Sequence, residues 1–177
     1  MKLTELVGKF GIDVHSQRKL IYLSSPYTGH ESEFYKKVLF ATGKLMKLGF
    51  SVYSPIVHGH VVQKQMDLPK NHKFWLEHDI PLLSRCDEVV VFCVEGTQYS
   101  QGIDFEVAYA IEHNIPVKLT FVCTGFRRGE TKDFEDTQFF MAIGDPVESF
   151  EDYRVKVKDI CASLSWDVPQ YTEAFDL

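Results

Sequence analysis

Glu106 falls on an apolar helical stripe, where its carboxylate could do chemistry. It lies three residues after Ile103 and four before Ala110, in the first turns of a predicted helix. A carboxylate on a buried face is uncommon unless it is paired or used. The positive end of the helix favours the ionised form, so we expect Glu106 to suit a nucleophile better than a general acid. The alternative is a routine capping or dipole contact.

Asp79 is a second carboxylate on an apolar face, four residues after Trp75 and four before Leu83. Burial there would favour the protonated form, as a general acid or base needs. The alternative is an ion pair with a neighbouring basic residue. Asp87 is different, because it starts a strand at the opposite edge of the predicted sheet, and we interpret it as a structural turn residue.

Two loops rich in small and hydroxyl residues could bind an anion through their backbone N–H groups. The first, Ser24–Gly29, has neither the phosphate-loop nor the dinucleotide pattern, and a plain capped turn is the alternative. Its Tyr27 could stack on a base or hydrogen-bond a carboxylate. The second loop precedes the Glu106 helix. The candidate substrate-binding residues of the two loops are Ser24, Ser25, Thr28, Gly29, Ser100 and Gly102.

A histidine pair, His58 and His60, lies in a middle segment that reads as a long polar loop over residues 55–70. A metal site needs a third ligand, which Asp67 or His72 could supply, but the spacing matches no metal motif. We therefore expect no metal, and assign the two histidines to a pocket lining or to a solvated loop.

The periodicity alternates between strand and helix, which predicts a single α/β domain with a flavodoxin- or Rossmann-like parallel sheet of four to five strands and helices on both faces. Strands are expected at 19–24, 50–54, 88–94 and 116–122, with helices between them and a last helix over 148–164. Ligands bind beyond the carboxyl ends of such strands, where both anion-binding loops and the middle segment meet.

The length of 177 residues fits one domain over 1–177, with a core at 19–122 and a C-terminal extension at 123–177. The net charge of −6 argues against binding long nucleic acids, and the chain has neither an 18-residue apolar run nor a secretory signal. The cysteines match no metal or redox spacing, so we expect free, buried and inert thiols in a reducing cytoplasm.

Three motifs together resemble the nucleoside 2-deoxyribosyltransferase-like superfamily, which includes 2'-deoxynucleoside 5'-phosphate N-hydrolases. They are the Ser24–Gly29 loop, the run Asp79–Asp87 leading into an apolar strand, and Ser100-x-Gly102-x-x-x-Glu106 opening a helix. The resemblance covers about residues 20–122. The longer middle segment with His58 and His60 and the residues after 122 depart from the pattern.

The resemblance implies that Glu106 is the nucleophile, Asp79 the acid that assists the base, and Tyr27 the residue that orients the nucleophile. Ser100 and Gly102 resemble the phosphate-contacting pair. The implied reaction cleaves an N-glycosidic bond of a (2'-deoxy)nucleoside 5'-monophosphate without metal or cofactor, in a homodimer or higher homo-oligomer that could bury Trp75, Phe139 and Phe140. A base-exchanging transferase and a non-catalytic nucleotide-binding module are the alternatives.

Overall fold

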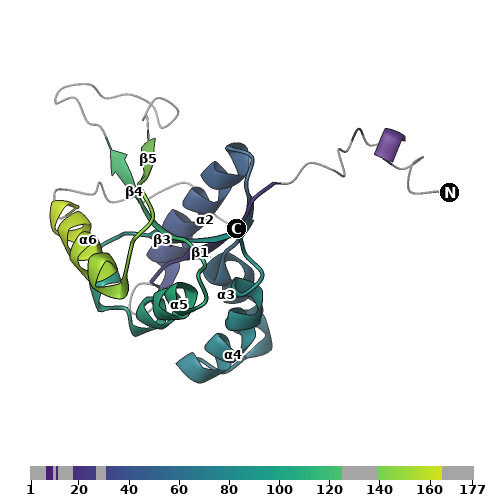
Figure 1. The fold of residues 1–177 in the computed structure, drawn as a ribbon. Coiled ribbons are helices and arrows are strands. Elements are labelled where there is room, and N and C mark those ends of the chain that lie inside the picture. Colours follow the sequence, from purple (N-terminus) through teal and green to yellow (C-terminus); the bar gives the residue numbers. More distant parts are fainter. Residues whose placement is uncertain (1–6, 10, 12–17, 27–30, 125–138, 165–177) are drawn as a thin grey trace, which may run out of the picture.

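The protein is described by a computed structural model that covers residues 7–9, 11, 18–26, 31–124 and 139–164, with the side chains of 31–34, 122–124 and 139–143 outside the description. The strands form one sheet in the order β2-β1-β3-β4-β5 (Figure 1). The first four pair in parallel, as predicted, and β5 runs antiparallel to β4. The strands are β1 (Leu20–Ser24), β2 (Ser51–Tyr53), β3 (Glu88–Phe92), β4 (Val117–Thr124) and β5 (Phe139–Ile143).

The helices follow the predicted stripes, with one exception. They are α2 (Glu31–Lys47), α3 (Pro55–Met66), α4 (His72–Leu83), the short 3-10 helix η1 (Thr97–Tyr99), α5 (Gln101–Glu112) and α6 (Phe150–Ser163). Asn71 caps α4 by accepting the Phe74 N–H at 2.9 Å, and Gly49 after α2 has the positive φ of 94° that favours glycine.

The prediction of a long polar loop over residues 55–70 was wrong, because most of this segment is helix α3. Ser54 caps the helix through the Val57 N–H at 3.3 Å, and Pro55 occupies the first turn, where its missing N–H costs nothing. The segment shows no continuous apolar stripe, since α3 leaves Val61 and Val62 exposed in the middle of the helix. The usual periodicity signal is therefore absent.

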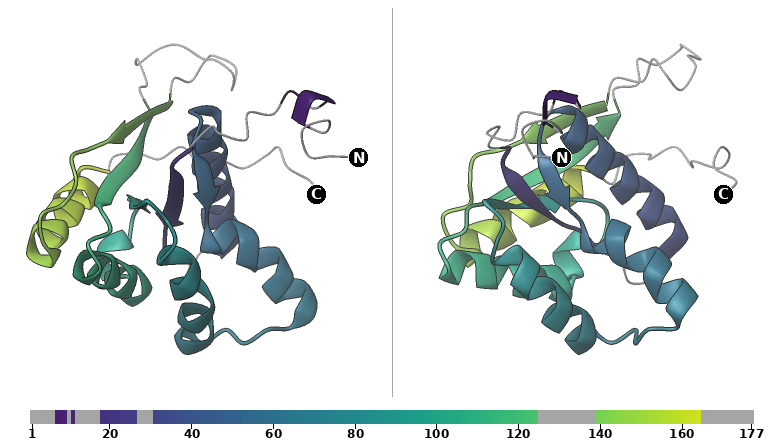
Figure 2. Two further views of the ribbon diagram at one scale, coloured as in Figure 1. Left: turned by 45° about the vertical axis from the view of Figure 1, so that its right-hand side comes forward. Right: turned by 90° about the vertical axis from the view of Figure 1, so that its right-hand side faces the viewer.

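Alternate residues along the central strands feed two apolar cores, one on each face of the sheet. The first core contains Ile21, Leu23, Val90 and Phe92 and is covered by α2 and the start of α3. The second contains Val89 and Val91 of β3, Cys93 just after it, and Val117 and Leu119 of β4. Helices α4, α5 and α6 cover this second core. Figure 2 shows α2 and α5 on opposite sides of the sheet. Two-sided burial explains why Val89–Phe92 of β3 are all apolar.

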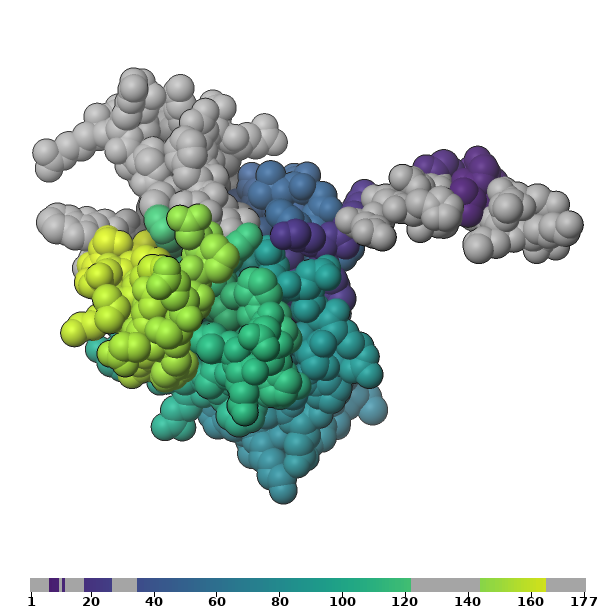
Figure 3. Space-filling view, viewed as in Figure 1, coloured from purple at the N-terminus to yellow at the C-terminus, as the bar shows by residue number. Residues whose placement is uncertain are grey.

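The C-terminal part completes this second core. Tyr153, Val157 and Cys161 of α6 are buried in it, and Arg154 bonds Asp104 of α5 at 2.8 Å. In the space-filling view α6, in yellow, lies against α5, in green (Figure 3). Residues 139–164 are therefore built into the same domain as the predicted core.

Three of the four cysteines, Cys86, Cys93 and Cys161, are free and buried, as expected for inert thiols. Burial raises the pKa of the Cys86 thiol to about 11 and also raises the pKa of the other two. None of the helices in the described part of the chain is long and apolar enough to cross a bilayer.

Candidate active site

A cavity of about 200 Å³ opens beyond the carboxyl ends of β1, β2 and β3. The chain passes from β1 to β2 on one side and later places β3 on the other, which is the switch point where open α/β sheets bind ligands. Segments following all three strands reach it through Ser25, Pro55 and Ser100. Both predicted catalytic carboxylates, Glu106 and Asp79, line this cavity.

Glu106 is held by hydroxyl donors on both of its carboxylate oxygens. The Tyr22 hydroxyl donates to Oε1 at 2.8 Å, and the Ser24 hydroxyl donates to Oε2 at 2.5 Å. Tyr22 and Ser24 are two residues apart on β1, so strand alternation points both toward the α5 face of the sheet. The carboxylate is thereby fixed in orientation, and each oxygen keeps a lone pair for a ligand.

The predicted preference of Glu106 for the ionised form meets an opposing effect, because the carboxylate is buried. Burial raises the pKa of Glu106 to about 7; the bonds from Ser24 and Tyr22 lower it, and the nearby Asp79 carboxylate raises it. Glu106 is the sixth residue of α5, beyond the first turn where the dipole acts most strongly. The group therefore changes charge near neutral pH.

Asp79 is also buried, with only 4% of its surface exposed. Its Oδ1 accepts a hydrogen bond from the Tyr53 hydroxyl at 2.8 Å and lies 2.9 Å from Nδ1 of His78. The contact with His78 is the ion pair with a basic neighbour that the sequence left open, when that imidazole is charged. The same carboxylate also lines the cavity. Its contact with a basic neighbour is therefore compatible with a role as general acid or base.

The anion-binding candidates are partly brought together. Ser25, Ser100 and Gly102 line the cavity, and the Ser25 Oγ is buried without a hydrogen-bond partner among the described residues. Ser100 caps α5 by accepting the Ile103 N–H at 3.5 Å, which places this helix start at the cavity. Ser24 is turned to Glu106 instead, so in this structure it holds the carboxylate.

Two basic residues that the sequence analysis did not place at the anion site, Lys70 and His72, line the same cavity. His72 lies beside the helix start, because a Cβ added to Gly102 would come 3.8 Å from its Nδ1. Their position could have been suspected only once α3 was recognised, since the turn after that helix brings residues 70–72 back to the sheet edge.

The histidine pair is divided between two cavities. His60 is buried, stacks on Tyr35 at 4.6 Å and lines the cavity with Glu106, whereas His58 stacks on Tyr53 at 4.8 Å and lines a neighbouring cavity. Residues two apart on an α-helix point to nearly opposite sides. No group of three metal-ligating side chains occurs among the residues that the structure describes.

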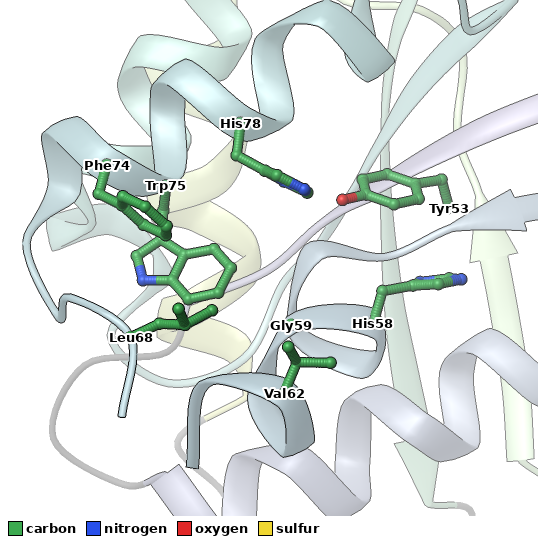
Figure 4. Close-up of a pocket in the computed structure, with 8 residues that line it drawn as sticks. All are labelled: Tyr53, His58, Gly59, Val62, Leu68, Phe74, Trp75 and His78. Carbon is green, nitrogen blue, oxygen red and sulfur yellow. The ribbon is translucent and has the colours of Figure 1, made fainter. Parts of the chain in front are cut away.

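The neighbouring cavity has a volume of about 240 Å³, and Figure 4 shows the residues that line it, Trp75 among them. Trp75 and Gly59 line both cavities, and a Cβ at Gly59 would lie 2.9 Å from the indole ring. Glycine therefore permits the close approach of α3 to the tryptophan. Trp75 thus lines both cavities. The sequence analysis had instead named it as a residue that an oligomer interface could bury.

Three predicted site residues, Tyr27, Thr28 and Gly29, lie outside the described residues, as do the side chains of Phe139 and Phe140. Two tyrosines were missed: Tyr22 and Tyr53 donate to the two carboxylates. The signal was weak, because a tyrosine in an apolar strand usually belongs to the core. The available signal was that two residues on the same face of one strand, Tyr22 and Ser24, both carry a hydroxyl group.

Comparison with known proteins gives a family match and similar solved structures. Residues 19–121 match the model of a family described as a domain of unknown function, DUF1937. No curated protein matches. The chain is similar to the structure of a 2-deoxyribosyltransferase from the psychrotolerant bacterium Bacillus psychrosaccharolyticus, with 19% identity and a TM-score of 0.41 over 76% of this chain and 90% of that one. Since the family model spans more than half of its length, the chain belongs to the DUF1937 family.

Proposed function

We propose that this protein cleaves the N-glycosidic bond of (2'-deoxy)nucleoside 5'-monophosphates through a covalent glycosyl–Glu106 intermediate. The observation that carries the proposal is the pair of buried carboxylates, Glu106 and Asp79, on one cavity, each held by its own tyrosine hydroxyl. Two carboxylates in different environments are what retaining glycosidic chemistry uses.

In the first step an oxygen of ionised Glu106 attacks C1' of the sugar. The bond from C1' to the base nitrogen breaks, its electron pair leaves with the base, and protonated Asp79 gives its proton to that base. Positive charge that builds at C1' is offset by the carboxylate beside it. The hydroxyls of Tyr22 and Ser24 keep the attacking group in place.

In the second step water attacks C1' of the glycosyl ester. Asp79 takes a proton from that water, the ester bond breaks, and the sugar 5-phosphate leaves with Glu106 restored. All proton and bond changes are supplied by these two carboxylates and water.

The 5'-phosphate is proposed to lie at the start of α5. Ser25, Ser100 and the N–H groups at this helix start are donors, and Lys70 and His72 line the same cavity. A free nucleoside would leave these groups without an anion. The preference for a 2'-deoxy sugar rests on the sequence resemblance alone.

The proposal is tested by incubating the protein with deoxynucleoside monophosphates, ribonucleoside monophosphates and deoxynucleosides, and measuring free base by chromatography. We expect release from a monophosphate, lost in Glu106→Gln and kept in Glu112→Gln, an exposed glutamate on the same helix. Adding a second base separates hydrolysis from transfer. If the protein binds a nucleotide but releases no base, the result would instead support a non-catalytic nucleotide-binding module.

A further inference from the structure

Asp79 receives its two hydrogen bonds from described residues on a single oxygen. Tyr53 donates to Oδ1 at 2.8 Å, and Nδ1 of His78 lies 2.9 Å from the same atom. Asp79 lines the cavity that holds Glu106, so Oδ2 is the oxygen left for a ligand there. The carboxyl group therefore stands between the cavity on one side and His78 on the other.

Asp79 and His78 differ sharply in how much of each side chain is exposed to solvent. The Asp79 side chain is 6% exposed, whereas that of His78 is 54% exposed. A ligand in the cavity would cover what remains of Asp79. Figure 4 shows the Tyr53 hydroxyl and the His78 ring directed toward one another at the edge of the neighbouring cavity. His78 is thus the polar contact that connects Asp79 to solvent.

The two donors on Oδ1 are not chemically equivalent. Burial and the Asp79 carboxylate raise the pKa of Tyr53 well above its ordinary value, so Tyr53 remains a donor. An imidazole is the side chain that gains and loses a proton near neutral pH. The titratable groups that face His78 are Asp79 on its own helix, Tyr53 on β2 and His58 on α3, with Glu106 on α5 across the first cavity.

We propose that His78 is a positioning residue that passes a proton through the Asp79 carboxyl group. When Oδ2 gives its proton to the leaving base, Oδ1 takes one from Nδ1 of the His78 imidazolium. In the water step the changes reverse: Oδ2 takes a proton from water and Oδ1 returns one to His78. Protons balance over the two steps, and Asp79 never holds a net charge while it is covered.

This inference rests on the proposed function and is tested with two variants of His78. Asparagine places an amide N–H near the position of Nδ1, so His78→Asn keeps the bond to Asp79 but cannot carry a proton. His78→Ala removes both and leaves space beside the neighbouring cavity. We expect kcat to fall roughly 10-fold or more in both variants. Added imidazole at constant pH and ionic strength should restore His78→Ala in a saturable way and leave His78→Asn unchanged.

His113→Ala is the matched control, because His113 is exposed, stacks on Tyr109 and lies at the end of α5. Its activity should equal that of the unmutated protein, with or without imidazole. Near-normal kcat in His78→Asn, or absence of rescue in a folded His78→Ala, would overturn the relay while leaving the proposed function intact. Absence of base release by the unmutated protein would instead overturn both.

Discussion

Ser24 donates a hydrogen bond of 2.5 Å to Glu106, although 82 positions separate the two residues in the chain. Ser24 ends β1, and Glu106 lies in the second turn of the helix that follows the neighbouring strand, β3. The parallel pairing of these strands brings the hydroxyl and the carboxylate together. The site is thus a product of sheet topology, and its behaviour should follow from this buried contact.

Removing the Ser24 hydroxyl should shift the pH dependence of activity. Glu106 must be ionised to attack, so kcat/KM of the unmutated protein should rise as pH passes through about 7. The Ser24 bond lowers the pKa of Glu106, and Ser24→Ala should therefore move this rise to higher pH. A profile of kcat/KM against pH measures the shift. Ser163→Ala, an exposed serine on α6, is the control, and an unshifted profile in Ser24→Ala would contradict the assignment.

Glu106 should also make stability depend on pH. Its pKa rises from the ordinary 4.5 to about 7 on folding, so the folded state prefers the neutral form. The free energy of unfolding should therefore be highest below pH 4.5 and fall by about 3 kcal/mol as the pH rises to about 7. Glu106→Gln should remove this loss. Denaturant unfolding at about pH 4 and about pH 8 compares the variant with Glu112→Gln, which should behave like the unmutated protein.

Asp79→Asn should slow departure of the base by roughly 10²-fold or more, because an amide cannot donate the acidic proton. Asparagine can still contact Tyr53, so the fold should be kept. Steady-state kinetics with a poor and a good leaving base make the test specific: the loss should be larger for the poorer one. Equal losses for both bases would argue against a proton donor. Asp159→Asn on the exposed side of α6 is the control.

Ser100→Ala should raise KM for a nucleoside monophosphate roughly 10-fold or more, since one good phosphate contact contributes about 1.5–3 kcal/mol. Activity on the free nucleoside should stay nearly unchanged. Because Ser100 also caps α5, Ser100→Gly is the second variant, in which the cap is lost at a cost of only a few tenths of a kcal/mol. If both variants weaken nucleoside and nucleotide equally, the phosphate lies elsewhere.

Much of the fold could be predicted from the sequence because apolar periodicity is a local signal. Val38, Ala41 and Leu45 marked α2, and Ile103, Val107 and Ala110 marked α5; all six are buried. Helix α3 was not predicted because it lacks a single apolar stripe. Strand β5 was not predicted because nothing in its residues indicates that they pair with β4 in the antiparallel direction.

The site was predictable where a residue broke a local pattern. Glu106 and Asp79 stood out as carboxylates on apolar faces, and both are buried at one cavity. Tyr22 and Tyr53 broke no pattern, since tyrosine fits a half-buried strand. Their roles depend on long-range contacts, from Tyr22 to Glu106 and from Tyr53 to Asp79, that only the folded chain creates.

The central claim is that Glu106 forms a covalent bond to the sugar, and mass spectrometry of the acid-quenched reaction tests it most directly. The protein is mixed with a deoxynucleoside monophosphate that it cleaves, quenched early, digested and mapped. We predict one added deoxyribosyl 5-phosphate on the peptide that contains Glu106, and no such adduct in Glu106→Gln. Continued release of base by Glu106→Gln, with no adduct on the unmutated peptide, would contradict the claim.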